Sequence, residues 1–155
     1  MSDDVHLTPE GAENLRLELG DLVNVRRPGL AIRLREAVAD GDLKENANYH
    51  DAKEQQSMVE GRIQYLQDVL RRATIVINDG PSDTVRIGSV VIIQEIGSDE
   101  EETYTLVGAA EANPREGKLS EKSPIGSALM GRKRGEKIKV NAPGGEISFK
   151  VKKVQ

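Results

Sequence analysis

The feature that most restricts the fold is a long run of apolar and small side chains at helical spacing. Between residues 49 and 70 these side chains alternate steps of three and four, which is the seam of a helix packed along a partner. The seam positions are Tyr49, Ala52, Gln56, Val59, Ile63, Leu66 and Leu70. The pattern therefore predicts a long helix whose apolar stripe requires a second helix beside it.

A second helical pattern precedes this one. Thr8 is a suitable N-cap, the proline after it fits the first helical position, and leucines follow at positions 15, 19 and 22. Pro28 removes one backbone donor and crowds the preceding turn, so we expect a bend or local break near Arg27. The pattern then resumes with Ile32 and Ala37. Because only a short turn separates the two helices, they are expected to run antiparallel, as a hairpin.

The turn between the helices, Asp40-Gly41-Asp42-Leu43-Lys44-Glu45-Asn46, concentrates three carboxylates at the end of the hairpin. About 30 residues at about 1.5 Å rise give a rod on the order of 45 Å long. Alanines at positions 37, 39 and 47 replace leucines near the turn, which makes the far end slender. Such a rod buries too little surface for a pocket, but it is suited to reaching into a narrow space.

Composition excludes several classes of protein. The 155 residues include no cysteine and only two distant histidines, so neither a disulfide framework nor a zinc cluster is expected. No apolar run approaches the roughly 18 residues of a membrane span, and the acidic N-terminus is unlike a secretory signal. We therefore expect a cytoplasmic protein with no membrane partner. The net charge of −4 means that any contact with nucleic acid has to be local.

The two halves of the chain differ in kind. Residues 1–78 carry 14 acidic and 10 basic side chains and few glycines, whereas residues 79–155 carry 12 of each. The turn-rich stretch DGPSD begins at residue 79, so we predict a hairpin domain over 1–78, a linker over 79–84 and a second domain over 85–155.

Runs of β-branched residues predict that this second domain is built on strands. They cover residues 74–78, 84–96, 103–107, 136–142 and 146–154, with a tight turn at 143–145. Ser123, Pro124 and Gly131 fit the cap, the first position and the stop of one short helix. The acidic run at 99–102 is expected to be a solvated loop between strands. The predicted fold class is α+β.

The acidic turn has two interpretations from its residues alone. Asp42 as N-cap and Glu45 three residues later make a capping box for the second helix. Alternatively, the carboxylates are placed at the end of a rod for a partner. Lys44 and Glu45 stand where an EF-hand loop starting at Asp40 needs an oxygen ligand and a glycine, so a calcium loop is excluded.

Several segments together resemble the Gre family of bacterial transcript cleavage factors. They include VRRP at 25–28, GDLKENANYHDAKEQQ at 41–56 and EGRIQYL at 60–66 in the first half. In the second half, DEEETYTLVG at 99–108, EKSPIGSALMG at 121–131 and APGGEISFKV at 142–151 are similar to the family in order and spacing. The resemblance covers essentially the whole chain.

The resemblance implies an N-terminal antiparallel coiled coil followed by an FKBP-like α+β domain. In this family the second domain docks at the secondary channel of RNA polymerase and the coil extends through it. The acidic tip then stimulates the polymerase's own Mg²⁺-dependent cleavage of nascent RNA in backtracked complexes. The chain itself is thus expected not to be an enzyme. It is expected to hold no cofactor of its own and to share only the Mg²⁺ of the polymerase active site.

The resemblance also assigns roles to individual residues. It implies that Asp42 helps to hold the polymerase's second Mg²⁺ and that Glu45 orients the attacking water or its surroundings. It implies that the nascent RNA 3′ end is contacted near the tip by Lys44, Asn46, Tyr49 and Lys53. The polymerase docking surface is expected to include Ser123, Pro124 and Ile125.

Basic residues along the rod form either a path for the RNA backbone or a solvated helix surface. They are Arg26, Arg27, Arg33, Arg35, Lys44 and Lys53. Val38 departs from the family pattern, because a basic residue is expected there, and this predicts a weaker hold on extruded RNA.

Two rival functions follow from the same resemblance. One is a channel-binding inhibitor that does not promote cleavage, and the other is a prolyl isomerase, which would need an aromatic-lined pocket. The chain has only four aromatic residues, which argues against such a pocket. The free protein is expected to be a monomer or to self-associate weakly through its exposed seam.

Overall fold

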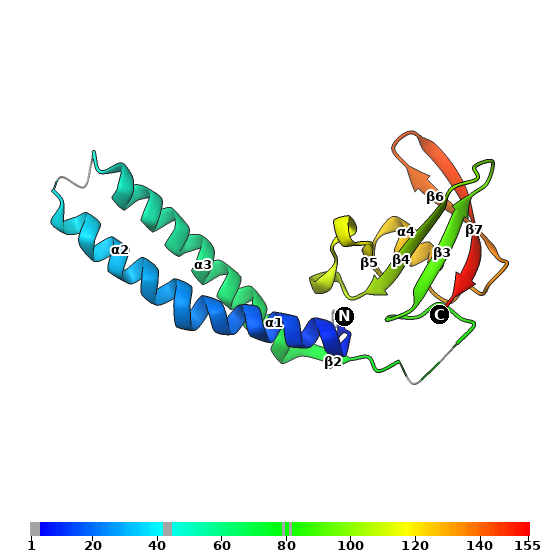
Figure 1. Cartoon of the computed structure of the whole chain (residues 1–155), viewed down its shortest axis with the longest axis horizontal. Helices are drawn as coiled ribbons and strands as arrows, with labels where there is room; N and C mark the ends of the chain where they lie inside the picture. The colour runs from blue at the N-terminus through cyan, green and yellow to red at the C-terminus, as the bar shows by residue number, and fades with distance from the viewer. Residues whose placement is uncertain (1–3, 42–44, 79, 81) are drawn as a thin grey trace. The chain divides into compact units, whose positions relative to one another are not determined.

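The computed structural model describes residues 4–41, 45–78, 80 and 82–155, and the chain divides into two compact units (Figure 1). The helical unit comprises residues 12–72, and the sheet unit comprises residues up to Gly11 together with residues 73–155. This division differs from the predicted boundary at residue 79, because short strands at both ends of the hairpin belong to the sheet unit.

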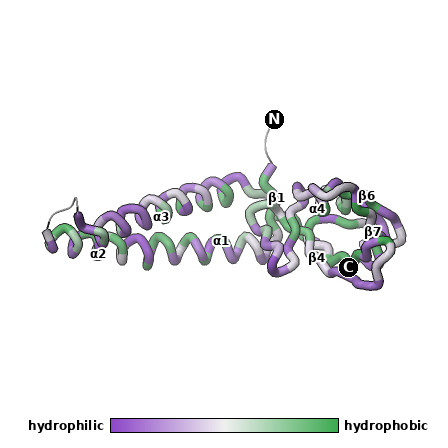
Figure 2. The backbone as a smooth tube through the Cα atoms, turned by 90° about the horizontal axis from the view of Figure 1, so that it is seen from above, coloured by the Kyte–Doolittle hydropathy of each residue, from purple (hydrophilic) through white to green (hydrophobic). Residues whose placement is uncertain are grey.

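The helical unit is the predicted antiparallel hairpin. Its first arm contains α1 (Pro9–Asp21), which begins in the sheet unit, then the π-helical turn η1 (Leu22–Arg26) and α2 (Arg27–Ala39). Its second arm is α3 (Ala47–Arg72). Hydrophobic and hydrophilic residues alternate along both arms, as helical periodicity requires (Figure 2).

The break expected near Arg27 takes the form of the wide turn η1, and the helix continues beyond it. The Arg27 N–H donates to the carbonyl of Leu22, five residues earlier. Pro28 has no N–H, and its ring crowds the carbonyl four residues earlier, which is that of Asn24. The wider turn makes room for that ring without interrupting the rod.

The seam between the arms is apolar at the base and narrow near the turn. Leu30, Val59 and Ile63 form a buried cluster, while Ala37 and Ala52 are fully buried nearer the turn. The expectation that Ile32 belongs to the seam is wrong, since its side chain is 50% exposed. The extra residue in η1 shifts the phase of α2, so Leu30 takes the place expected for Ile32, while Ala37, seven residues after Leu30, faces the partner as expected.

The sheet unit contains a five-stranded sheet in the order β5-β4-β3-β7-β6 and a separate pair, β1-β2. All neighbours in the larger sheet are antiparallel except β4 and β5, while β1 and β2 are parallel. The strands are β1 (Val5–Leu7), β2 (Ala73–Ile75), β3 (Val90–Glu95), β4 (Glu101–Val107), β5 (Lys118–Ser120), β6 (Lys137–Ala142) and β7 (Gly145–Val154).

One face of this sheet carries the core of the unit. The buried cluster combines alternate residues of β3, β6 and β7 with Leu106 of β4 and Leu129 of the short helix α4 (Pro124–Leu129). Each of these strands alternates buried and accessible residues, so the opposite face of the sheet is left to solvent.

Three elements differ from the sequence prediction. The segment predicted as one strand over 84–96 is a strand only from Val90, because Gly88 has a φ of +91° and the chain turns there. Glu101 and Glu102 of the expected acidic loop are the first residues of β4. The strands β1 and β5 have three residues each and were not predicted.

A carboxylate fixes the start of α1 within the sheet unit. Thr8 is the predicted N-cap, since its hydroxyl accepts from the Gly11 N–H at 3.0 Å. Glu111, in the 3₁₀ turn η2 (Ala109–Glu111), accepts from the Thr8 N–H at 2.8 Å and also from the Thr8 hydroxyl. A negative charge at a helix N-terminus is favourable, so this contact stabilises the first turn.

Across the described residues, no helix is both long enough and apolar enough to cross a membrane.

Candidate functional site

The end of the hairpin is held by one side chain, that of Asn46. Its Oδ1 accepts from the Tyr49 N–H at 3.0 Å, and its Nδ2 donates to the carbonyl of Ala37 at 2.7 Å. The first contact caps α3 and the second reaches the last turn of α2. One amide thus bonds a backbone group at the end of each helix, and the Ala37 carbonyl also accepts from the Asp40 N–H at 3.3 Å.

This arrangement rules out one of the two interpretations of the acidic turn, the capping box. Because α3 begins at Ala47 with Asn46 as its N-cap, the predicted capping box with Asp42 as cap and Glu45 in the first turn is wrong. Asn46 has the better position, since the same side chain can also reach Ala37. Glu45 therefore lies outside the helix and is not committed to capping it.

Glu45 is exposed just before the cap, and it makes no ion pair with the residues that the structure describes. Asp42 and Lys44, the other predicted tip residues, lie outside the described residues. Elsewhere in the described part, no three His, Cys, Asp or Glu side chains are grouped closely enough to hold a metal ion. The described part of the turn thus presents two exposed carboxylates, those of Asp40 and Glu45.

A shallow groove of about 290 Å³ lies between the arms close to the turn. Its lining combines an apolar floor with one phenol and two cations: Leu34, Arg35, Val38, Tyr49 and Lys53. Arg35 and Lys53 are both exposed, and neither makes an ion pair within the described ranges. The groove therefore brings together Tyr49 and Lys53, two of the residues expected to contact RNA, with Arg35 as a second cation.

Other basic residues of the hairpin are engaged in holding its arms together. Arg33 donates to Asn48 at 2.8 Å and to Asp51 at 2.7 Å. Arg27 grips Glu60 with two hydrogen bonds of 2.7 and 2.8 Å, which lowers the pKa of Glu60 and raises that of Arg27. Arg27 and Arg33 thus hold the two arms together. Fewer basic residues of the hairpin are therefore left to contact an RNA backbone than expected.

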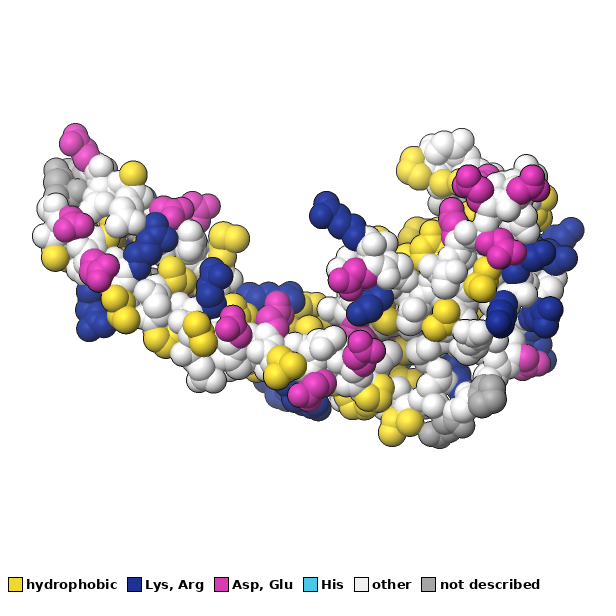
Figure 3. All heavy atoms as spheres, in the orientation of Figure 1, with side chains coloured by type: hydrophobic (Ala, Val, Ile, Leu, Met, Phe, Trp, Pro, Cys, Tyr) yellow, Lys and Arg dark blue, Asp and Glu magenta, His cyan; other side chains and the backbone are white. Residues whose placement is uncertain are grey.

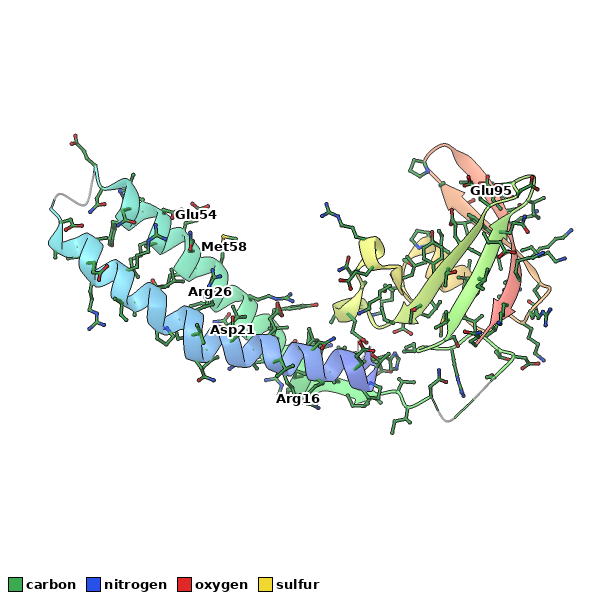
Figure 4. The ribbon with its side chains drawn as sticks, viewed as in Figure 1. Arg16, Asp21, Arg26, Glu54, Met58 and Glu95 are labelled. Carbon is green, nitrogen blue, oxygen red and sulfur yellow. The ribbon has the colours of Figure 1, made fainter. Side chains whose placement is uncertain are left out.

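One flank of α3 carries side chains that point away from the first arm. Glu54 and Met58 project from α3 on the side opposite α2 (Figure 4), and Met58 is 68% exposed. They lie outside the groove and provide sites for control substitutions.

The segment predicted to dock on a partner lies beside an apolar groove of the sheet unit. Ser123 caps α4, accepting from the Gly126 N–H at 3.0 Å and donating to the carbonyl of Ser120 at 2.7 Å. Together with Pro124 and Ile125 it lines a groove of about 300 Å³. Sequence reasoning missed the other walls, which come from β5, β6, β7 and the turn between them: Leu119, Val140, Asn141, Ala142, Pro143, Ile147 and Phe149.

Known proteins match both halves of the chain. Residues 5–75 match the family described as "Transcription elongation factor, N-terminal", and residues 80–155 match "Transcription elongation factor, GreA/GreB, C-term". Transcription elongation factor GreA of Bacillus velezensis is 45% identical over 148 residues, covering 96% of this chain and 94% of the relative. The GreA of Rhodospirillum rubrum is 45% identical over 152 residues, covering 97% of each.

A solved structure of the transcription factor Gfh1 is 30% identical, covers 100% of this chain and 99% of its own, and has a TM-score of 0.49.

Proposed function

The chain belongs to the GreA/GreB family of transcription elongation factors, and on this premise we propose that it binds RNA polymerase and stimulates cleavage of nascent RNA in backtracked complexes. The hairpin would enter the secondary channel of the polymerase and bring its turn to the RNA 3′ end. The polymerase's own active site would carry out the hydrolysis. The protein would therefore act in the cytoplasm, as an activator without a reaction of its own.

The observation that carries this proposal is the pair of hydrogen bonds that the Asn46 side chain makes with the two helices. Because Asn46 caps α3 and reaches Ala37, the carboxylate of Glu45 is held at the end of the rod but is free of capping. A carboxylate presented in this way can accept a proton or orient a water once a partner supplies the metal. We assign this role to Glu45 and a share in holding the polymerase's Mg²⁺ to Asp42.

The groove near the turn suits the RNA end. Phosphate oxygens would meet Arg35 and Lys53, while a base would lie on the apolar floor against Tyr49. Lys44 and Asn46 would complete the contacts around the turn. The charge available here is modest, which fits a site that holds RNA only while it is being cut.

Docking is assigned to the sheet unit. The apolar groove beside Ser123, Pro124 and Ile125 would bind an apolar segment of the polymerase. Burial of that segment would supply most of the binding free energy. The hairpin would then need little affinity of its own. This division of roles predicts that turn variants bind the polymerase normally.

The test uses RNA polymerase stalled and backtracked on a template, with the nascent RNA labelled at its 5′ end. Wild-type protein is expected to shorten the RNA, whereas Asp42→Ala and Glu45→Ala are expected to lose most of the stimulation. Glu54→Ala is the matched control, because Glu54 is an exposed carboxylate seven residues into α3, about 10 Å from its start.

Binding is measured separately, by competition of each variant with labelled wild-type protein for the polymerase. Full cleavage by both turn variants would contradict the assigned roles. If the wild-type protein binds and slows elongation without shortening the RNA, the chain is instead a channel-binding inhibitor.

A further inference from the structure

Charge in the sheet unit is segregated along the chain. Residues 79–131 carry ten acidic and four basic side chains, whereas residues 132–153 carry eight basic and two acidic ones. The whole chain has a net charge of −4, so this short basic segment opposes the sign of the molecule. Figure 3 shows Lys and Arg side chains gathered beside β7.

The strand register brings four of these cations onto the solvent face of the sheet. Lys137 of β6 lies directly opposite Lys150 of β7, and Lys139 lies two residues further along β6. Lys153 of β7 is paired with Ile92 of β3. All four lysines are exposed, and Ile138, Val140, Phe149 and Val151, which flank the first three of them, are buried in the core, while Lys153 follows an irregularity in the pairing of β7 with β3. We call Lys137, Lys139, Lys150 and Lys153 the lysine face.

Little of this charge is neutralised inside the protein. In the described part of the chain, the two acidic residues of the basic segment pair with Arg132 and with Lys139, the latter at 3.7 Å. Within that same part, Lys137, Lys150 and Lys153 make no ion pair. Three ammonium groups, of which those of Lys137 and Lys150 belong to directly opposite residues, are thus left facing solvent.

This arrangement is unfavourable for the sheet itself. Like charges directly opposite each other on neighbouring strands repel, and Lys137 and Lys150 are such a pair. Lysines on an edge strand can protect a sheet against aggregation, which would account for β6. That explanation does not reach Lys150 and Lys153, because β7 lies between β3 and β6. A bound polyanion would relieve the repulsion.

The chemistry of the face favours duplex DNA over a single strand. Single-stranded nucleic acids are held by aromatic side chains on which bases stack, and the aromatics of this sheet point the other way. Phe149 is buried in the core, and Tyr104 is in register with the buried Val91. A duplex keeps its bases stacked and presents phosphates, at one charge per about 1.7 Å of axis. Lys137, Lys139 and Lys150 occupy opposite or alternate positions about 5–7 Å apart on the sheet, which matches such a dense array.

We propose that the lysine face binds the phosphate backbone of duplex DNA without reading its sequence. This goes beyond the cleavage function and does not depend on it, since the residues that carry the two functions are different. The attachment is weak and dependent on salt, as contacts made only to phosphates are.

The experiment measures binding of the full chain to a fluorescent 20-base-pair duplex of arbitrary sequence by anisotropy at several salt concentrations. The lysine-face variant is Lys137→Gln with Lys150→Gln, and the matched control is Arg115→Gln with Lys122→Gln. Both remove two exposed cations from the sheet unit. The lysine-face variant is expected to lose about tenfold or more in affinity at low salt and to have a shallower salt slope, while the control binds as wild type.

Further arms identify the partner. A single strand of the same length and a polyglutamate of equal charge are added as competitors. The duplex should compete best, whereas stronger competition by either of the others would overturn the assignment to DNA. Equal losses in the lysine-face variant and the control would show that the face is not the site and would also overturn it.

Two readouts separate this proposal from simple damage and from the cleavage function. Removing the repelling pair should leave the unfolding temperature unchanged or raise it. The lysine-face variant should still stimulate RNA cleavage in backtracked complexes, and Asp42→Ala should still bind the duplex. Loss of DNA binding in Asp42→Ala as well would contradict the separation of the two surfaces.

Discussion

The Asn46 side chain donates to the carbonyl of Ala37 at 2.7 Å while it caps the helix that follows. Ala37 belongs to the last turn of α2, and its carbonyl also accepts from the N–H of the C-cap residue Asp40 at 3.3 Å. One side chain therefore bonds both the end of α2 and the start of α3, and so fixes the end of the hairpin that carries the acidic turn.

Substitutions at Asn46 can separate its two contacts. Asn46→Ala loses both and is expected to lower the free energy of unfolding by about 1–2 kcal/mol. Asn46→Asp keeps an acceptor for the Tyr49 N–H but cannot donate to Ala37, so it should preserve the helix and reduce cleavage stimulation. Circular dichroism during thermal unfolding and the cleavage assay measure the two effects. Normal cleavage by Asn46→Asp would mean that the cap alone is sufficient.

The ion pair between the arms predicts a dependence on pH. Hydrogen bonding to Arg27 lowers the pKa of Glu60 below its ordinary value of 4.5. A carboxylate with a lowered pKa contributes stability that is present above that ordinary value and is lost as the pH falls through the lowered one. Glu60→Gln should thus be less stable than wild type at pH 7, with the difference closing below pH 4.5.

Denaturant unfolding of both proteins between neutral and acid pH measures this difference. Glu54→Gln is the control, because Glu54 is exposed and makes no ion pair within the described residues, so its replacement breaks no contact between the arms. A gap between Glu60→Gln and wild type that stays constant down to strongly acid pH would contradict the role of the pair.

Two glycines predict opposite effects of the same substitution. Gly61 lies in α3 with open space where a Cβ would be added, so Gly61→Ala should raise stability by about 0.5–1 kcal/mol. At Gly108 the added Cβ would lie 1.6 Å from the carbonyl oxygen of His6, so Gly108→Ala must displace β1. We expect it to cost about 1–3 kcal/mol, the usual range for overpacking. Denaturant unfolding of the two variants checks the signs, and an unchanged Gly108→Ala would contradict the packing of β1.

A charge restored to the groove should strengthen its hold on RNA. Val38 lines the groove with Arg35 and Lys53 and is 51% exposed, so an arginine can be accommodated there without entering the core. Val38→Arg is expected to increase crosslinking of the hairpin to the RNA 3′ end, more at low salt than at high salt. Val38→Gln, which adds polarity without charge, is the control. Equal crosslinking by both variants and wild type would remove the groove from the RNA path.

The periodicity of the sequence predicted the hairpin because its helices depend on repeated local features. Spacings of three and four, the N-cap at Thr8 and the cap at Ser123 are all readable from neighbouring residues. The strands β1 and β5 could not be read in this way, since each has three residues and is defined by its partner elsewhere in the chain.

The contacts at the candidate site could not be predicted from residue types alone. Asp42 and Asn46 are both good capping residues by type, and the choice depends on the carbonyl of Ala37, nine residues before Asn46. Likewise, Arg33 and Arg35 look equivalent in the sequence. The structure gives Arg33 partners in Asn48 and Asp51 and leaves Arg35 on the groove.

The π-helical turn η1 sets the azimuth of the hairpin's end. One additional residue in a helix turns everything beyond it by about 100° about the axis, while the length changes by only about 1.5 Å. The five residues of η1 thus act as a rotational offset between the base of the first arm and its end. The direction in which the arm presents Arg35 and Val38 is therefore encoded about ten residues earlier, in a turn that touches neither of them.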